Sequence, residues 1–140
     1  MQLEVRRVDD AFMLEATNET GFKISSDAAP SIGGNNMGFR PMQLMLFSVA
    51  SCSSIDILSI LKKQKQDILD FRVTVSGERE KDVVPSLFTK IHLHYIFTGN
   101  LSEEKVKRAI DLSVNKYCSA SKTLEKSGAM IKTSYEILNP

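Results

Sequence analysis

The chain has 140 residues, a common size for a single domain, and its 42% hydrophobic and 25% charged residues exclude a disordered, collagen-like or low-complexity protein. Eighteen basic and 17 acidic residues leave a net charge of +1, which offers no electrostatic footprint for nucleic acid or anionic lipid. Two cysteines are too few for the disulfide framework of a small secreted domain, and the charged stretch Met1–Arg7 has no continuous apolar run for a signal peptide. We therefore expect one cytoplasmic domain, residues 1–140.

The N-terminal third is predicted to form strands followed by a loop. Residues 2–8 and 11–17 are rich in Val, Leu and Phe and are separated by two aspartates, which is typical of a hairpin. A third strand is expected over 22–26, after Gly21. Residues 27–38 then change to Ala, Pro, Ser, Gly and Asn, which predicts a long loop.

A long helix is expected from Pro41, a residue that suits the first helical position, to about Lys65. Between Pro41 and Lys62 its only charged residue is Asp56, and its apolar residues spread around most of the circumference. A helix of this kind is predicted to be buried.

A membrane span is the alternative for this helix, since about 20 apolar residues can cross a bilayer. Gln43, Asp56 and five serines oppose it, because each polar group would be costly in lipid. Because one domain has limited material to cover such a helix, we expect a homodimer in which the small residues around Cys52 let a second subunit approach closely.

The C-terminal half is predicted to contain two strands, two helices and a final strand. Residues 71–76 and 87–98 are strand-like, and in the second Ile91 and Leu93 share one face while His92 and His94 share the other. Ser102 begins an amphipathic helix that ends near 116, a short helix covers 117–127, and a strand covers 130–138. The order indicates an α+β fold and not a doubly wound parallel sheet.

Cys52 and Cys118 are the main candidates for chemically reactive side chains. Two inert core thiols are the simpler interpretation, because free Cys is among the most buried residue types. Neither cysteine has a metal ligand at close spacing, and no C-x-x-C redox motif is present. Composition alone leaves open whether the two cysteines are inert core thiols or reactive ones.

Two segments resemble the OsmC/Ohr family of osmotically induced and organic-hydroperoxide-resistance proteins. Gly38-Phe39-Arg40-Pro41-Met42-Gln43-Leu44, running into the helix around Cys52, is similar to the family's central helix, and Tyr117-Cys118-Ser119-Ala120-Ser121 is similar to its second cysteine motif. With their separation and the strand order, the resemblance covers essentially the whole chain. It is closest to a branch of redox proteins with Pro-Met before this helix.

The resemblance implies antiparallel sheets wrapped around the buried central helix in an intertwined homodimer. It also implies a thiol peroxidase that reduces organic hydroperoxides, with Cys52 as the peroxidatic and Cys118 as the resolving cysteine. An external dithiol would then reduce the disulfide. No cofactor and no metal are implied.

A reactive thiolate needs a nearby cation, helix N-terminus or hydrogen-bond donor. Cys52 lies about 16 Å from the start of its own helix, so that dipole cannot help, and Arg40 can approach it only from a partner subunit. Arg6 and Arg7 on the first strand are the other candidates.

The chain departs from the family pattern at Met42, where the resemblance leads one to expect a Glu that orients an activating Arg. Gln43 can accept a hydrogen bond but adds no charge. A non-catalytic protein that binds an apolar ligand or a protein partner is therefore the alternative function.

Two further clusters receive structural interpretations. His92 and His94 are expected about 7 Å apart on one strand face, but no third metal ligand is evident, which favours a solvated or interface pair. Asp56, one helical turn after Cys52, would raise the pKa of a nearby thiol, so we expect it to accept a hydrogen bond from an N–H or a hydroxyl.

Overall fold

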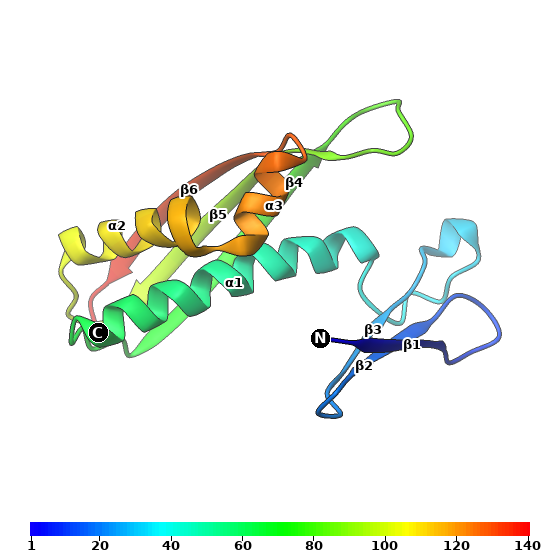
Figure 1. The fold of residues 1–140 in the computed structure, drawn as a ribbon, viewed down its shortest axis with the longest axis horizontal. Coiled ribbons are helices and arrows are strands. Elements are labelled where there is room, and N and C mark those ends of the chain that lie inside the picture. The colour runs from blue at the N-terminus through cyan, green and yellow to red at the C-terminus, as the bar shows by residue number, and fades with distance from the viewer. The chain divides into compact units, whose positions relative to one another are not determined.

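The computed structural model describes residues 1–140. It has an α+β fold, as predicted, with six strands, three α-helices, a 3-10 turn and a π turn (Figure 1). In chain order these are β1 (Leu3–Arg7), β2 (Leu14–Asn18), β3 (Lys23–Ser26), η1 (Pro30–Ile32), α1 (Pro41–Lys63), β4 (Asp70–Arg79), β5 (Phe88–Thr98), α2 (Glu103–Leu112), η2 (Ser113–Tyr117), α3 (Ser119–Lys126) and β6 (Met130–Leu138). The chain divides into two compact units, Met1–Met45 and Leu46–Pro140, described here in turn.

The first unit is a three-stranded antiparallel sheet, β1-β2-β3, followed by a loop. Asp27 organises this loop: its Oδ1 accepts a hydrogen bond from the N–H of Ala28 (2.7 Å), and its Oδ2 accepts from the N–H groups of Asn35 (3.1 Å) and Met37 (2.9 Å). These bonds, the one from Met37 foremost, hold the pKa of Asp27 below its usual range against the opposing effect of burial. The Asp27 carboxylate thus connects the start of the loop to its end.

The second unit contains a three-stranded sheet in the order β4-β5-β6. β4 and β5 are antiparallel, as predicted, whereas β6 is parallel to β5, a pairing that the expected antiparallel sheets did not include. The physical reason is the connection, because α2 and α3 carry the chain back along the sheet before β6 begins. The parallel pairing puts both helices on the face that also carries α1 (Figure 1).

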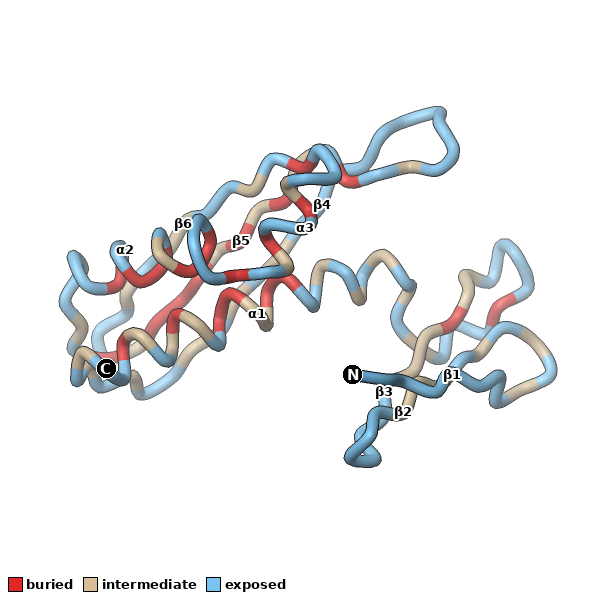
Figure 2. The backbone as a smooth tube through the Cα atoms, in the orientation of Figure 1, coloured by how far each residue is buried: buried red, intermediate tan, exposed pale blue.

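The core of the second unit lies on one face of β5 (Figure 2). Its fully buried side chains alternate along the strand as predicted, and Phe71 of β4 adds ring contacts to Tyr95 (6.3 Å between centroids) and Phe97 (5.1 Å). The helices contribute a further set, including Val49, Ile57, Leu61, Val106, Ala109 and Leu124. The sheet face and three helices therefore share one apolar core.

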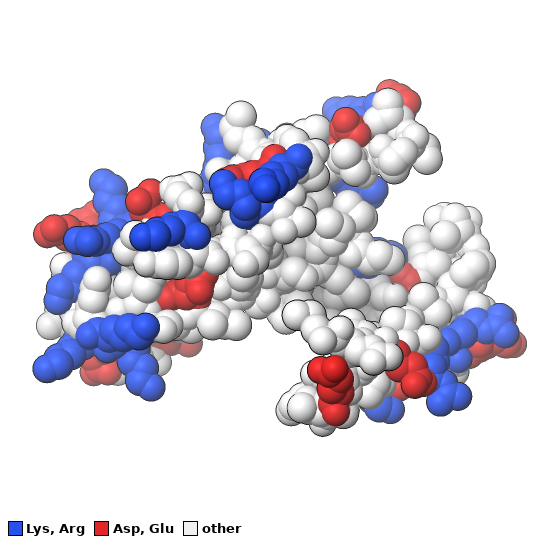
Figure 3. Space-filling view, viewed as in Figure 1, with Lys and Arg blue, Asp and Glu red and all other residues white.

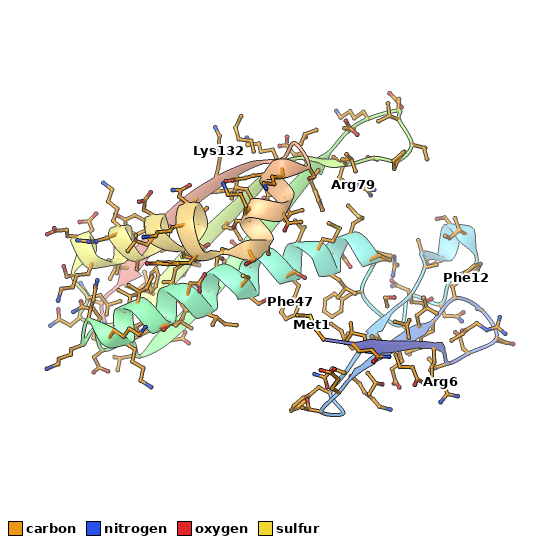
Figure 4. The ribbon with its side chains drawn as sticks, in the orientation of Figure 1. Met1, Arg6, Phe12, Phe47, Arg79 and Lys132 are labelled. Carbon is orange, nitrogen blue, oxygen red and sulfur yellow. The ribbon has the colours of Figure 1, made fainter.

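α1 is buried along one face only within this chain, in contrast to the burial expected on nearly all sides. Ile57 and Leu61 are fully buried, whereas Phe47 is 56% and Ile55 67% exposed. Phe47 projects from the helix away from α3 (Figure 4), and the surface along the middle of α1 is largely uncharged (Figure 3). A single chain leaves this apolar face uncovered.

The end of α1 falls close to the predicted position. Lys65 adopts a left-handed conformation (φ 54°), its N–H bonds to the carbonyl of Lys62, and the N–H of Gln66 bonds to that of Leu61. These two hydrogen bonds satisfy carbonyl groups that the last helical turn would otherwise leave without a partner. It turns the chain out of α1 and toward β4.

Candidate functional site

The second unit brings Cys52 and Cys118 together. Cys52 lies on α1, and Asp56 follows it by four residues on the same helix face. The two sulfurs and a carboxylate oxygen of Asp56 all lie within 4.8 Å of one another. Cys52 and Asp56 are half-buried, while Cys118 is buried. The site is therefore open on the side of α1.

A π turn positions Cys118. The chain leaves α2 through Ser113–Tyr117, and the N–H of Cys118 bonds to the carbonyl of Ser113 at 2.7 Å, five residues back. This wider spacing ends the helix, and Cys118 itself has extended backbone angles (φ −71°, ψ 105°). π turns within helices often occur at functional sites. Here the turn places the thiol at the start of α3.

Cys118 is the N-cap of α3. Its Sγ accepts a hydrogen bond from the N–H of Ser121 at 3.4 Å. The Ser121 hydroxyl is fully buried and makes no hydrogen bond of good geometry. It nevertheless interacts with the Cys118 sulfur in the sense that lowers the pKa of this thiol. Both groups favour a negative charge on this sulfur.

Burial nevertheless raises the pKa of the Cys118 thiol above its usual range. The hydrogen bonds from Ser121 oppose the shift, while a hydrogen bond to Cys52 and the charge of that residue increase it. Burial and the neighbouring Cys52 thus favour the protonated form of Cys118.

Ser113 ties the π turn to α1. Its hydroxyl lies 3.0 Å from the carbonyl oxygen of Ser53 and 3.3 Å from Oδ2 of Asp56. The prediction that Asp56 accepts a hydrogen bond from a hydroxyl is therefore confirmed. The contact fixes the carboxylate next to both thiols.

Tyr95 supports the same region from the sheet. Its hydroxyl donates to Oγ of Ser53 at 2.7 Å, and Ser53 in turn donates to the carbonyl of Val49 at 2.8 Å. Burial raises the pKa of Tyr95 to about 12; the Ser53 hydroxyl lowers it and the charge of Cys118 raises it further. Tyr95 is therefore a neutral donor that anchors α1 to β5 one residue from Cys52.

The predicted activating residues all belong to the first unit. The guanidinium of Arg40 donates from Nη1 to the carbonyls of Asp27 (3.2 Å) and Gly38 (3.1 Å), so this side chain braces the loop. Gln43 accepts a hydrogen bond from the N–H of Arg40 at 2.9 Å, which caps the start of α1.

Arg6 and Arg7 lie on β1, where both are exposed. Arg6 makes a 3.6 Å ion pair with Glu4 on the same strand and extends from the sheet surface (Figure 4). Such exposed pairs contribute little to stability.

The histidine pair lies on the face of β5 away from the core. Nε2 of His92 and Nδ1 of His94 lie 2.8 and 2.7 Å from the same hydroxyl, that of Ser134 on β6, and His94 also approaches Glu136 at 3.4 Å. One hydroxyl thus makes hydrogen bonds with both rings. The arrangement agrees with the structural interpretation of this pair.

A surface groove of about 870 Å³ lies elsewhere in the second unit. It is bordered by residues of α2 and β6, among them Glu103 and Tyr135, whose side chains form a 2.9 Å hydrogen bond. Neither cysteine borders this groove.

Three residues of the site were not among the predicted site residues. Asp56 carried a signal, since it lies one turn after Cys52 on the helix. Ser113 and Tyr95 carried none, because their positions depend on the π turn and on the packing of β5 against α1.

One helix, Pro41–Lys63, is long and apolar enough to cross a membrane, with a mean hydropathy of 1.9 over its most apolar window. A core helix of a soluble protein passes the same test, and this one packs its buried face against the sheet.

Comparisons with known proteins agree on one family. Residues 33–134 match the family model described as OsmC-like protein. Protein YhfA of Escherichia coli K12 is 44% identical over 115 residues, which cover 81% of this chain and 78% of YhfA.

Solved structures show the same fold. A hypothetical protein from Aquifex aeolicus VF5 superposes with a TM-score of 0.84 at 28% identity, over 99% of this chain and 96% of its own. An organic hydroperoxide resistance protein OsmC from Legionella pneumophila superposes with a TM-score of 0.71 at 17% identity, over 97% of each chain. At that identity the second match shows the fold alone.

Proposed function

The chain belongs to the OsmC-like protein family, and from this premise we propose that it is a thiol peroxidase that reduces organic hydroperoxides with Cys52 and Cys118. The observation that carries the proposal is the approach of the two sulfurs to within 4.8 Å, with one half-buried and the other buried. The name of the Legionella protein supports the choice of substrate class.

The reaction takes place in two steps. The Cys52 thiolate attacks the terminal oxygen of the hydroperoxide, the O–O bond breaks and Cys52 becomes a sulfenic acid. The departing alkoxide takes a proton from solvent and leaves as the alcohol. The Cys118 sulfur then attacks the Cys52 sulfur, and the hydroxyl leaves as water. An external dithiol returns the disulfide to two thiols by exchange.

The exposure of the two sulfurs supports this order. A hydroperoxide must reach the first sulfur from solvent, and Cys118 is only 3% exposed whereas Cys52 is half-buried. Burial, together with the neighbouring Cys52, raises the pKa of Cys118 and so favours the thiol form of the sulfur assigned to the second step.

The second step uses the cap of α3. Once Cys52 is a neutral sulfenic acid, its charge no longer opposes ionisation of Cys118. The N–H and hydroxyl of Ser121 then stabilise the Cys118 thiolate. Forming the disulfide requires the sulfurs to approach to about 2.05 Å, a small movement of the π turn toward α1.

A cation is still needed in the first step, because the Asp56 carboxylate disfavours a neighbouring thiolate. We propose that an arginine of the N-terminal unit of a partner subunit supplies it, with Arg6, Arg7 and Arg40 as candidates. Arg40 braces its own loop, so Arg6 and Arg7 are the candidates that can move without disturbing the fold.

The partner in this proposal is a second copy of the chain. Phe47 and Ile55 leave an apolar face of α1 exposed, and a homodimer that buries it fits the expectation from the sequence. We place the enzyme in the cytoplasm, where dithiol reductants keep thiols reduced.

The test is steady-state turnover with an organic hydroperoxide and a dithiol. The wild-type chain is expected to consume the hydroperoxide, Cys52→Ser to be inactive, and Cys118→Ser to react once and stop as a sulfenic acid that a dimedone-type reagent captures. If Cys52→Ser consumes hydroperoxide at the wild-type rate, the proposal fails. Absence of turnover in the wild-type chain would instead favour the alternative, a non-catalytic member of the fold.

A further inference from the structure

We propose that the reduced site also binds a thiophilic divalent cation such as Zn²⁺, with Cys52, Cys118 and Asp56 as its three ligands. Their three donor atoms all lie within 4.8 Å of one another. This inference requires the two thiols and the carboxylate, and it does not depend on peroxidase activity.

The distances suit a tetrahedral site. With metal–sulfur bonds of about 2.3 Å, two thiolates on one zinc ion lie about 3.8 Å apart, and a carboxylate oxygen lies slightly closer to each. The observed upper limit of 4.8 Å is near these values, so modest side-chain movements bring all three atoms into range.

The number and kind of ligands point to an open site. Three protein ligands leave the fourth tetrahedral position for water, as in zinc sites that exchange their ligands. Because Cys52 and Asp56 are half-buried, that position is accessible to solvent, and Cys118 lies on the buried side of the site. Thiolate ligands select zinc and similar ions over magnesium or calcium.

Outer contacts orient the ligands as metal sites require. The Ser113 hydroxyl donates to Oδ2 of Asp56, and the Ser121 N–H donates to Sγ of Cys118. Such contacts fix the direction of a ligand and limit the rearrangement needed when the ion enters.

Metal binding by the two thiols needs no further reactant. The cation displaces one proton from each thiol, and both protons go to solvent, so two thiols and M²⁺ give a bis-thiolate complex and 2 H⁺. A two-electron oxidant such as a hydroperoxide takes an electron pair from the two thiolates and, with two protons, becomes alcohol and water. The sulfurs then form a disulfide, both thiolate ligands are lost and the ion is released. A bound cation would therefore protect the thiols, and oxidation would free the cation.

The experiment uses the full-length reduced protein with Cd²⁺ and Zn²⁺ as probes. Cd²⁺ is expected to produce a thiolate charge-transfer band in the ultraviolet that saturates at one ion per chain, and Zn²⁺ is expected to compete for the same site. Zn²⁺ should also slow alkylation of Cys52 and Cys118 together.

The variants separate the proposed ligands from other groups. Cys52→Ser or Cys118→Ser should weaken binding by more than about 100-fold, beyond the usual effect of an outer-shell change, and Asp56→Asn by about tenfold or more. The matched control is Asp111→Asn, which should bind as wild type. Asp111 lies on α2, where its carboxylate accepts a hydrogen bond from the side-chain amide of Asn115. His92→Ala with His94→Ala should also bind as wild type.

Thermal melting of each metal-free variant shows whether the fold is retained. A Zn²⁺ affinity that survives loss of both cysteines, or that is lost in the histidine variant, would overturn the inference. So would wild-type affinity in a folded Asp56→Asn variant. A chain that binds Cd²⁺ but turns over no hydroperoxide would leave the metal inference intact and refute the peroxidase proposal.

Discussion

Ser113 joins the π turn to α1, because its hydroxyl lies 3.3 Å from Oδ2 of Asp56 and also bonds the carbonyl of Ser53. We predict that Ser113→Ala lowers the free energy of unfolding by about 1 kcal/mol, the usual net worth of a buried hydrogen bond. It should also slow disulfide formation once Cys52 is oxidised, since the turn that carries Cys118 is less firmly held. Chemical denaturation measures the free energy of unfolding, and intact-mass analysis of samples quenched at successive times measures the rate of disulfide formation.

The control is Ser59→Ala, at an exposed position of α1, which should change stability by less than about 0.5 kcal/mol. If Ser113→Ala behaves like this control in both measurements, the hydroxyl has no role in positioning Cys118.

Tyr95 is predicted to make stability fall at alkaline pH. Its pKa is raised to about 12 in the folded chain from the ordinary value of 10.0, so the unfolded chain loses this proton first. The stabilisation is complete below pH 10 and is lost as the pH rises through 12. Tyr95→Phe should remove this part of the pH dependence and cost about 1 kcal/mol at neutral pH through the lost bond to Ser53.

Tyr135→Phe is the matched control, since its hydroxyl bonds Glu103 at an exposed position. It should melt close to wild type at neutral pH. Equal alkaline curves for wild type and Tyr95→Phe would contradict the assignment.

Asp27 is predicted to make the first unit sensitive to acid. The bonds from Met37, Ala28 and Asn35 lower its pKa below 3.8, so its contribution is present above that value and is lost as the pH falls through the lower, folded-state pKa. Asp27→Asn should loosen the loop at neutral pH and raise the rate of proteolytic cleavage within residues 28–38 severalfold. Asp10→Asn, at an exposed position, should be cleaved like wild type.

Ile55 is predicted to lie in a dimer interface, as it is 67% exposed on an otherwise apolar helix. Ile55→Glu should shift the molar mass measured by light scattering from dimer toward monomer, because an unpaired charge is costly in an apolar interface. Lys126→Glu on α3 tests charge alone and should leave the mass unchanged. A wild-type chain that is monomeric at high concentration would refute the dimer.

Much of the fold could be predicted because its signals are local. Pro41 and the apolar run after it fixed the start of α1, Ser102 fixed the cap of α2, and the alternation of Ile91 and Leu93 with the two histidines fixed the faces of β5. Each depends on neighbours within a few residues, so the sequence shows it directly.

The remaining features depend on long-range packing. The parallel pairing of β6 follows from where α2 and α3 return the chain, and the π turn at Ser113–Tyr117 interrupts what the pattern predicted as one helix to about 116. Asp56 was visible as a neighbour of Cys52, but its approach to Cys118 required the turn. Residue types alone do not show that the side chains of Asp56 and Cys118 lie close together.

The measurement that tests the central claim most directly is a count of free thiols by alkylation and intact mass, before and after one equivalent of an organic hydroperoxide. The proposed mechanism predicts that Cys52 and Cys118 are lost together, with a mass two hydrogens lower and a monomer-sized species on a non-reducing gel. Oxidation of Cys52 to an acid with Cys118 still open to alkylation, or no oxidation of either thiol, would contradict it.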